Sequence, residues 1–256
     1  MENGRQALEL AVDAGEVLLK NGAEIRRVQE TIERLLSAWG LSPWSVYVIP
    51  NGIFAMAARD YYEIRYVPQT DTNLGRVDAV NTLSREVTAS GGAIDPEAVR
   101  SKVKQAAQLP YARPALCAAA CGIGSMGFCL IFGGSFYDGL ATLICGTLLE
   151  GVNQLIGQRM NRYMWALLGG VMVALLSALA SGLIPDLSGE FILAGVILRL
   201  VPGVTFTTAV RDFFGGDTVS GAVHLFDASL VGVCIAAGVA AARPLWTLFS
   251  GGAPWF

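Results

Sequence analysis

The stretch YARPALCAAACGIGSMGFCLIFGGSFY, residues 111–137, holds one charged residue, Arg113, and marks a change between two kinds of sequence. Residues 1–113 contain 27 of the chain's 39 Asp, Glu, Lys and Arg residues, whereas the 143 residues that follow contain only 12. A charge-rich segment is typical of a soluble domain, and long charge-free runs are typical of membrane helices. The sequence therefore predicts a cytoplasmic domain over residues 1–112 and a membrane domain over residues 113–256.

Five apolar runs follow Arg113, and each is close to the ~20 residues that cross a hydrocarbon core. We expect transmembrane helices at about 114–134, 137–157, 163–184, 190–210 and 218–241. Lys and Arg residues precede the first run, separate the second from the third and follow the fourth, whereas the loops GGSFYD and PDLSGE carry only acids. Because basic loops stay in the cytoplasm, the N-terminus is expected inside and the C-terminus outside.

The first domain is expected to be a small α+β fold. Helices are predicted over 5–20, 22–39 and about 73–89, and Asp95-Pro96-Glu97 has the composition of a further helix start. In the second helix, the apolar residues recur at helical spacing and form one stripe: Ile25, Val28, Ile32, Leu35, Leu36 and Trp39. Strands are predicted at 44–49, 53–57 and 61–67. Asn51-Gly52 predicts a hairpin turn between the first two strands, in which both turn residues have positive φ. The predicted fold class is thus an α-helical membrane protein of about five transmembrane helices with an N-terminal cytoplasmic α+β domain.

Three charged residues lie well inside the apolar runs, away from their ends: Glu150, Arg199 and Asp227. Charge at membrane depth costs several kcal/mol on most scales and usually faces a solute path or a protein interior, so transport is the leading function class. Counted along continuous helices, Arg199 and Asp227 lie at roughly similar depths in the membrane, which leaves two interpretations open. Arg199 and Asp227 pair and neutralise each other, or Arg199 binds a substrate carboxylate while Asp227 acts as counter-ion or proton carrier.

Pro202-Gly203 interrupts the fourth run, because proline removes a backbone hydrogen bond and clashes with the preceding turn. This pair predicts either a packing kink or a broken helix that exposes amide groups toward a carboxylate. In the second case, the hydroxyl groups of Thr205, Thr207 and Thr208 are candidate donors to the substrate.

Other polar residues near these runs have a packing or a functional interpretation. Histidine is the side chain that changes charge most readily near physiological pH, so His224 is a candidate for proton coupling, with helix packing as the alternative. Asp212 and Asp217 flank the loop FFGG and are expected to be loop and N-cap residues. In the first domain, a turn or cap role is the default for Asn51, Asn73 and Arg76.

The sequence gives no sign of cofactor or metal chemistry. It contains no Walker loop, dinucleotide fingerprint, nucleophile elbow or HExxH motif, and its five cysteines lack metal-binding spacing. No basic cluster indicates nucleic acid. We therefore expect no cofactor, no metal and no nucleic-acid partner.

Several segments, in order, resemble the bacterial threonine/serine exporter family. These are NGAEIRRVQETIERLLSAWGL with SVYVIPNGIFA, then DTNLGRVDAVNTLSREVTASGGAIDPEA, FGGSFYDGLATLICG and LRLVPGVTFTTAVRDFFGGDTVSGAVHLFDA. The resemblance implies a bacterial inner-membrane transporter. It also makes Asp212 and Asp217 candidate gate residues, and it makes the polar positions of the first domain that match the family best candidate site residues: Asn51, Asn73 and Arg76. With five expected helices, the chain is similar to the larger subunit of the family's two-subunit branch. That branch includes a succinate exporter whose second subunit is a short all-membrane protein of about four or five helices.

The chain departs from the family pattern at three positions: Gln29, His224 and Arg199. Arg199 is not part of the amino-acid exporter pattern and favours an anion, so succinate or a related dicarboxylate is the first expected substrate and threonine or serine the second. A homo-oligomer is the competing assembly. The alternative from another class is a membrane-anchored enzyme or sensor with its activity in residues 1–110; against it, that segment shows no nucleophile–base pair.

The loop charges generate a topology prediction. The last run is expected to end outside. A reporter that is active only in the periplasm should therefore be active when fused after Phe256, and a reporter that is active only in the cytoplasm should be inactive there. Activity of the cytoplasmic reporter alone would contradict the predicted orientation.

Overall fold

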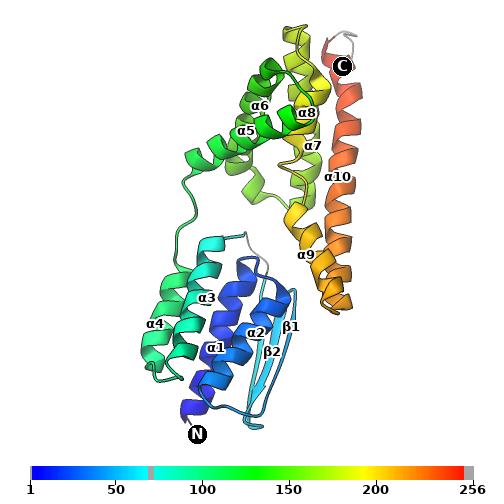
Figure 1. Ribbon diagram of the computed structural model, residues 1–256. Coiled ribbons are helices and arrows are strands. Elements are labelled where there is room, and N and C mark those ends of the chain that lie inside the picture. The colour runs from blue at the N-terminus through cyan, green and yellow to red at the C-terminus, as the bar shows by residue number, and fades with distance from the viewer. Residues whose placement is uncertain (1, 69–71, 251–256) are drawn as a thin grey trace. The chain divides into compact units, whose positions relative to one another are not determined.

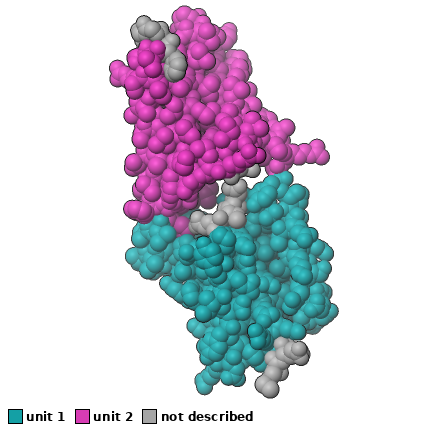
Figure 2. All heavy atoms as spheres, turned by 180° about the vertical axis from the view of Figure 1, so that it is seen from behind, with its two compact units in different colours: residues 1–111, 208–223 teal, residues 112–207, 224–256 magenta. Residues whose placement is uncertain are grey.

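The computed structural model describes residues 2–68 and 72–250, and the chain divides into two compact units, coloured separately in Figure 2. The first unit comprises residues 1–111 and 208–223, and the second comprises residues 112–207 and 224–256. Each unit has its own buried apolar cluster.

Residues 1–111 of the first unit contain four helices and one three-stranded sheet, at the positions that the sequence predicts to within a few residues. The helices are α1 (Glu2–Lys20), α2 (Ile25–Ala38), α3 (Leu74–Ala89) and α4 (Pro96–Ala107), and the strands are β1 (Trp44–Ile49), β2 (Gly52–Ala57) and β3 (Tyr61–Tyr66). The expected start of α4 is confirmed, since the Asp95 side chain accepts a hydrogen bond from the Glu97 amide.

The strands form an antiparallel sheet in the order β1-β2-β3. Ile49 pairs with Gly52, so Pro50 and Asn51 form the first turn, one residue earlier than expected. The expectation of positive φ at Asn51 and Gly52 was wrong, because Pro50 takes the first turn position with its fixed negative φ. Among the described non-glycine residues, positive φ occurs at Ala58 and Arg59, in the second turn.

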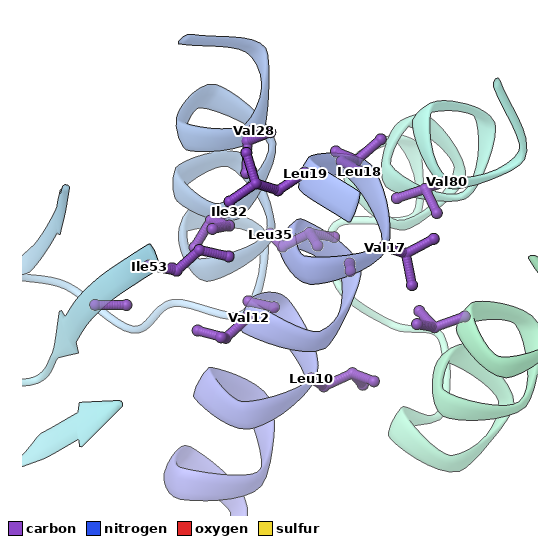
Figure 3. Close-up of a cluster of buried hydrophobic side chains, with 14 of the residues drawn as sticks. Leu10, Val12, Val17, Leu18, Leu19, Val28, Ile32, Leu35, Ile53 and Val80 are labelled. Atoms are coloured by element: carbon purple, nitrogen blue, oxygen red, sulfur yellow. The ribbon is translucent and has the colours of Figure 1, made fainter. Parts of the chain in front are cut away.

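Helices α1 and α2 lie on one face of this sheet, and α1 also packs against α3 and α4 (Figure 1). Figure 3 shows Ile53 of the sheet near Val12 of α1 and Ile32 of α2, with Val80 of α3 on the far side of α1. All four side chains are fully buried. The amphipathic stripe that the sequence shows on α2 is therefore the face that covers the sheet.

An ion network joins α1 to β3 on the same side of the sheet. Arg65 contacts Asp13 at 3.0 Å, Glu16 at 2.7 Å and Glu63 at 2.6 Å, and Lys20 also pairs with Glu16. Burial by itself raises the pKa of Glu16, but the hydrogen bonds from Lys20 and Arg65 outweigh it and lower that pKa below its ordinary value. The network therefore stabilises the packing of α1 when Glu16 is ionised.

The second unit is helical. Its elements are α5 (Pro114–Ile131), α6 (Phe136–Leu155), the 3-10 turn η1 (Gly157–Arg159), α7 (Arg162–Leu183) and α8 (Gly189–Ile197), and it includes the first part of α9 (Gly203–Phe214) and most of α10 (Thr218–Ser250). Helices α5 and α6 form an antiparallel hairpin, and α8 packs against both of them and against α7.

In the described part of the chain, three helices are long and apolar enough to cross a membrane: α5, α7 and α10. The chain is thus a membrane protein by the composition of its helices. The fourth run is not one helix but the short pair α8 and α9, and α6 carries Asp138 and Glu150. The total of five crossings stays a prediction.

Glycines allow the helices of the second unit to approach closely. A Cβ atom added at Gly195 of α8 would lie 2.7 Å from the Ser125 carbonyl oxygen of α5 and 2.8 Å from Thr142 Cγ2 of α6. Likewise, a Cβ at Gly238 of α10 would lie 2.1 Å from the Leu167 carbonyl oxygen of α7. Contacts of this kind are typical of membrane-helix interfaces, where small residues let backbones pack together.

The Arg65 network generates a prediction about pH. The pKa of Glu16 is lower in the folded chain than its ordinary value of 4.5, so its ionised form adds stability above that pH and loses it as the pH falls through the folded pKa. Arg65→Met should therefore make the loss of stability between pH 6 and pH 3 smaller than in the wild type. The difference should be under about 1 kcal/mol, because solvent screens the Arg65–Glu16 pair.

The measurement is thermal unfolding of the full chain in detergent, followed by circular dichroism at both pH values. Arg26→Met is the matched control, because Arg26 pairs with Glu30 on the exposed surface. An unchanged pH dependence in Arg65→Met would contradict the assignment.

The glycine contacts generate a second prediction. Gly195→Ala should lower the free energy of unfolding by about 1–3 kcal/mol, because the new methyl group meets backbone that cannot yield without moving α8. Gly124→Ala is the control, since a Cβ at this α5 position meets no heavy atom of another described residue within 4 Å. It should be neutral or stabilising by helix propensity. Equal thermal midpoints for the two variants would contradict the close approach.

Candidate functional site

The best-defined polar cluster of the second unit is an ion pair between α6 and the turn after α8. Arg199 places Nε 3.0 Å and Nη2 2.8 Å from the same oxygen, Oε2 of Glu150. The side chains of Asn153 and Gln154, one turn further along α6, donate to the Glu150 carboxylate at 3.4 Å. The Cys121 thiol of α5 lies beside the pair.

The two partners differ in exposure, and the difference decides what the site can do. The Glu150 side chain is 8% exposed and that of Arg199 is 44% exposed. A guanidinium has five donors in a planar fork, and the two contacts with Glu150 engage only one side of it. Arg199 is therefore held in place by a buried carboxylate and still offers donors to an anion.

This geometry corrects the expectation that Arg199 and Asp227 pair with each other. Asp227 of α10 instead contacts Arg162, at the start of α7, at 2.7 Å, and accepts a hydrogen bond from the Tyr163 hydroxyl at 2.8 Å. The expectation failed because the depth of Arg199 was counted along one continuous helix. The helix in fact ends at Ile197, so Arg199 lies in a turn and faces α6.

The predicted break at Pro202-Gly203 is confirmed. Helix α8 ends after nine residues, and α9 begins at Gly203. The turn between them is held by bonds from the Arg199 and Leu200 amides to the carbonyls of Val196 and Ile197. The break therefore places Arg199 on irregular backbone, which membrane proteins tolerate where it is enclosed by protein or lines a cavity.

The threonines after the break differ in what they contact. The hydroxyl of Thr207 donates to the carbonyls of Gly203 and Val204, so it bonds to its own helix. Thr205 and Thr208 are half-buried on the same helix. Their expected role as donors to a substrate stays a prediction, as does proton coupling by His224, which is buried on α10.

The first unit contains a cleft of about 580 Å³, formed by α2 and residues 211–217. Arg211 contacts Glu24 across it at 2.9 Å, and Gln29 of α2 also lines it. The acidic lining residues outnumber the basic ones: Glu24, Glu30, Glu33, Asp212 and Asp217 against Arg26 and Arg211. The cleft therefore carries more negative than positive charge, which disfavours an anion there.

Both candidate gate residues lie at this cleft. Asp212 is buried, and Asp217 accepts hydrogen bonds from the Ser220 amide at 3.1 Å and hydroxyl at 2.8 Å, the geometry of a cap on α10. Neither hydropathy nor spacing indicated that Glu24 and Arg211, 187 residues apart, contact each other.

The remaining candidates of the first unit have turn, cap and packing contacts. Asn73 caps α3 by accepting from the Arg76 amide, and Asn51 lies in the β1–β2 turn. Arg76 donates to the Leu109 carbonyl at 2.9 Å and covers the Tyr111 ring at 4.7 Å. These contacts attach the segment that follows α4 to α3. Among the described residues, no group of three or more His, Cys, Asp and Glu side chains is arranged to hold a metal.

Comparison with known proteins gives one family and two named relatives. Residues 9–246 match the family model described as "Putative threonine/serine exporter". The chain is 26% identical to the "Probable succinate transporter subunit YjjP" of Escherichia coli (strain K12), over 96% of this chain and 97% of that protein. It is 25% identical to the protein of the same description in Klebsiella aerogenes, over 95% of each. No solved structure matches.

Proposed function

The chain belongs to the threonine/serine exporter family, and from this premise we propose that it is one subunit of an inner-membrane exporter of a small carboxylate. Succinate or a related dicarboxylate is the proposed substrate, and a short all-membrane protein is the proposed partner. The names of the two relatives support both parts, since each is described as a succinate transporter subunit.

The observation that carries the substrate proposal is the partly exposed Arg199 guanidinium at the helix break. A carboxylate bound by a guanidinium fork forms charge-assisted hydrogen bonds, the strong class of such contacts. The proposal assigns Glu150 the counter-ion role that the sequence suggested for Asp227. Glu150 balances the Arg199 charge while the site is empty, and the substrate carboxylate competes for the same guanidinium.

We propose that backbone amide groups at the adjacent helix break also help to bind the substrate carboxylate. Pro202 and Gly203 interrupt the fourth run three residues after Arg199, and α9 starts at Gly203 with its first amide groups pointing back along the helix axis. The positive end of a helix favours negative charge. We place Thr205 and Thr208 in the same substrate path, as hydroxyl donors on α9.

Gating is assigned to the acidic cleft of the first unit. Asp212 and Asp217 anchor the turn between α9 and α10, and the Glu24–Arg211 pair attaches that turn to α2. An exposed pair of this kind contributes at most about 1 kcal/mol, which suits a contact that opens and closes.

A threonine or serine exporter is the second candidate, and one observation favours it. The site presents a carboxylate next to a guanidinium, and an amino acid carries an ammonium and a carboxylate group. Glu150 would then bind the ammonium group instead of serving only as counter-ion. The two candidates differ in what Glu150→Gln does: it should affect amino-acid export far more than dicarboxylate export.

The proposal is tested by export from cells loaded with succinate, threonine or serine, with the partner co-expressed. Arg199→Ala should reduce succinate export about 10- to 100-fold, since a hydrogen bond to a charged group is worth ~1.5–3 kcal/mol. Arg162→Ala is the matched control: Arg162 has a similar exposure, 43%, and a similar contact, 2.7 Å from Asp227. It should retain most of the export.

The amount of each variant in the membrane and its co-purification with the partner are measured alongside. Loss of assembly in Arg199→Ala would favour a merely structural Arg199–Glu150 pair, because a buried carboxylate would be left unpaired. Equal retention of all three solutes with and without this chain would rule out the exporter. Full export by this chain reconstituted alone would rule out the partner.

A further inference from the structure

The third strand of the first unit reverses the usual alternation of a half-covered sheet. Its charged residues, Glu63 and Arg65, face the helices and join the ion network of α1, while Tyr62, Ile64 and Tyr66 face outward. In an ordinary antiparallel sheet with one solvated face, the apolar residues face the core and the charged residues face water. This strand therefore has its apolar side on the uncovered face.

The neighbouring strands continue this pattern. In register with Ile64 stand Phe54 of β2 and Tyr47 of β1, whose rings lie 6.4 Å apart. The rows on either side complete a face of nine positions without a charged residue: Ser45, Tyr47, Ile49, Gly52, Phe54, Met56, Tyr62, Ile64 and Tyr66. We call these nine residues the outer sheet face.

The outer sheet face is large for a surface that only contacts water. Tyr62, Ile64 and Tyr66 are 68%, 73% and 73% exposed, Tyr47 is 52% and Phe54 is 40%. Because a large side chain offers 150–250 Å², these five expose on the order of 600 Å². Contiguous apolar patches of that size mark interaction sites, and two of them facing each other would bury about 1,200 Å², enough for a specific interface.

We propose that the outer sheet face pairs with the same face of a second copy of this chain, which makes the exporter subunit a dimer through its first unit. The absence of charge favours self-pairing, because an isologous contact places the patch against a second copy of itself, where charges of one sign on the patch would meet charges of the same sign and repel them. A site for anionic lipid would instead carry Lys or Arg residues. Two sheets stacked about 10 Å apart form an ordinary sandwich, and rows of tyrosine, phenylalanine and isoleucine can fill the space between them.

The test is cross-linking of the full chain in native membranes. Ile64→Cys places a thiol at the centre of the face, and Leu74→Cys places one at an equally exposed apolar position of α3, 72% against 73%. Both variants keep the five native cysteines, which therefore contribute equally to the background. With a short bis-maleimide, Ile64→Cys should give severalfold more cross-linked dimer than Leu74→Cys. Equal yields would overturn the proposal.

A second pair of variants tests the same face without added thiols. Ile64→Asp should lower the dimer fraction of the detergent-solubilised chain severalfold, as measured by light scattering, because each copy would bury an unpaired charge in the interface. Leu74→Asp is the control and should leave the dimer fraction unchanged. Thermal unfolding of Ile64→Asp that matches the wild type shows that the fold is intact. If Ile64→Asp does not fold, Tyr62→Lys is used as the test variant in its place. A dimer that survives these substitutions, a wild-type monomer, or quenching of a label at residue 64 by lipid probes would each overturn the proposal.

Discussion

The contact between Arg199 and Glu150 imposes the main constraint on the second unit. A guanidinium in an apolar helical unit requires a partner, because an unpaired charge at membrane depth costs several kcal/mol on most scales. Glu150 satisfies this requirement from α6 only because α8 ends at Ile197 and the chain turns. If the fourth run continued as one helix, helical periodicity alone would determine which way Arg199 points, and the turn that brings it to Glu150 would be absent. The charge pair thus depends on the break in the fourth run.

Close helix packing is what brings the two partners within hydrogen-bond distance. Gly195, four residues before Arg199, lets α8 pack against the backbone of α5 and the Thr142 side chain of α6. A larger residue there would separate α8 from α6, and the ion pair would lengthen with it. The glycines of the apolar runs therefore do more than make the helices pack. They determine which charges can meet, and on the proposed function they position the group that binds the substrate.

Much of the fold could be predicted from the sequence, because local signals determine it. The stripe on α2, the Asp95 cap and the proline–glycine break all act over a few residues, and the structure contains each of them. Ion-pair partners could not be predicted in the same way. Arg199 was matched to Asp227 by depth in the membrane, whereas contacts depend on which helices are neighbours and which faces they present. The prediction that Asn51 and Gly52 form the turn with positive φ failed for a local reason, because the preceding Pro50 takes the first turn position and fixes a negative φ there.

The two units use their charges in opposite ways. This difference connects the proposed substrate site of the second unit with the proposed dimer contact of the first. In the second unit, a buried carboxylate positions a cation that keeps donors available, which is a property of a binding site. In the first unit, Arg65 is enclosed by Asp13, Glu16 and Glu63 on the covered side of the sheet, so its charge is fully balanced and holds α1 in place. Charge placed inside leaves β3 with tyrosine and isoleucine outside. A strand with this pattern gains nothing from water on its apolar side, and in the proposed dimer a second sheet of the same kind covers it.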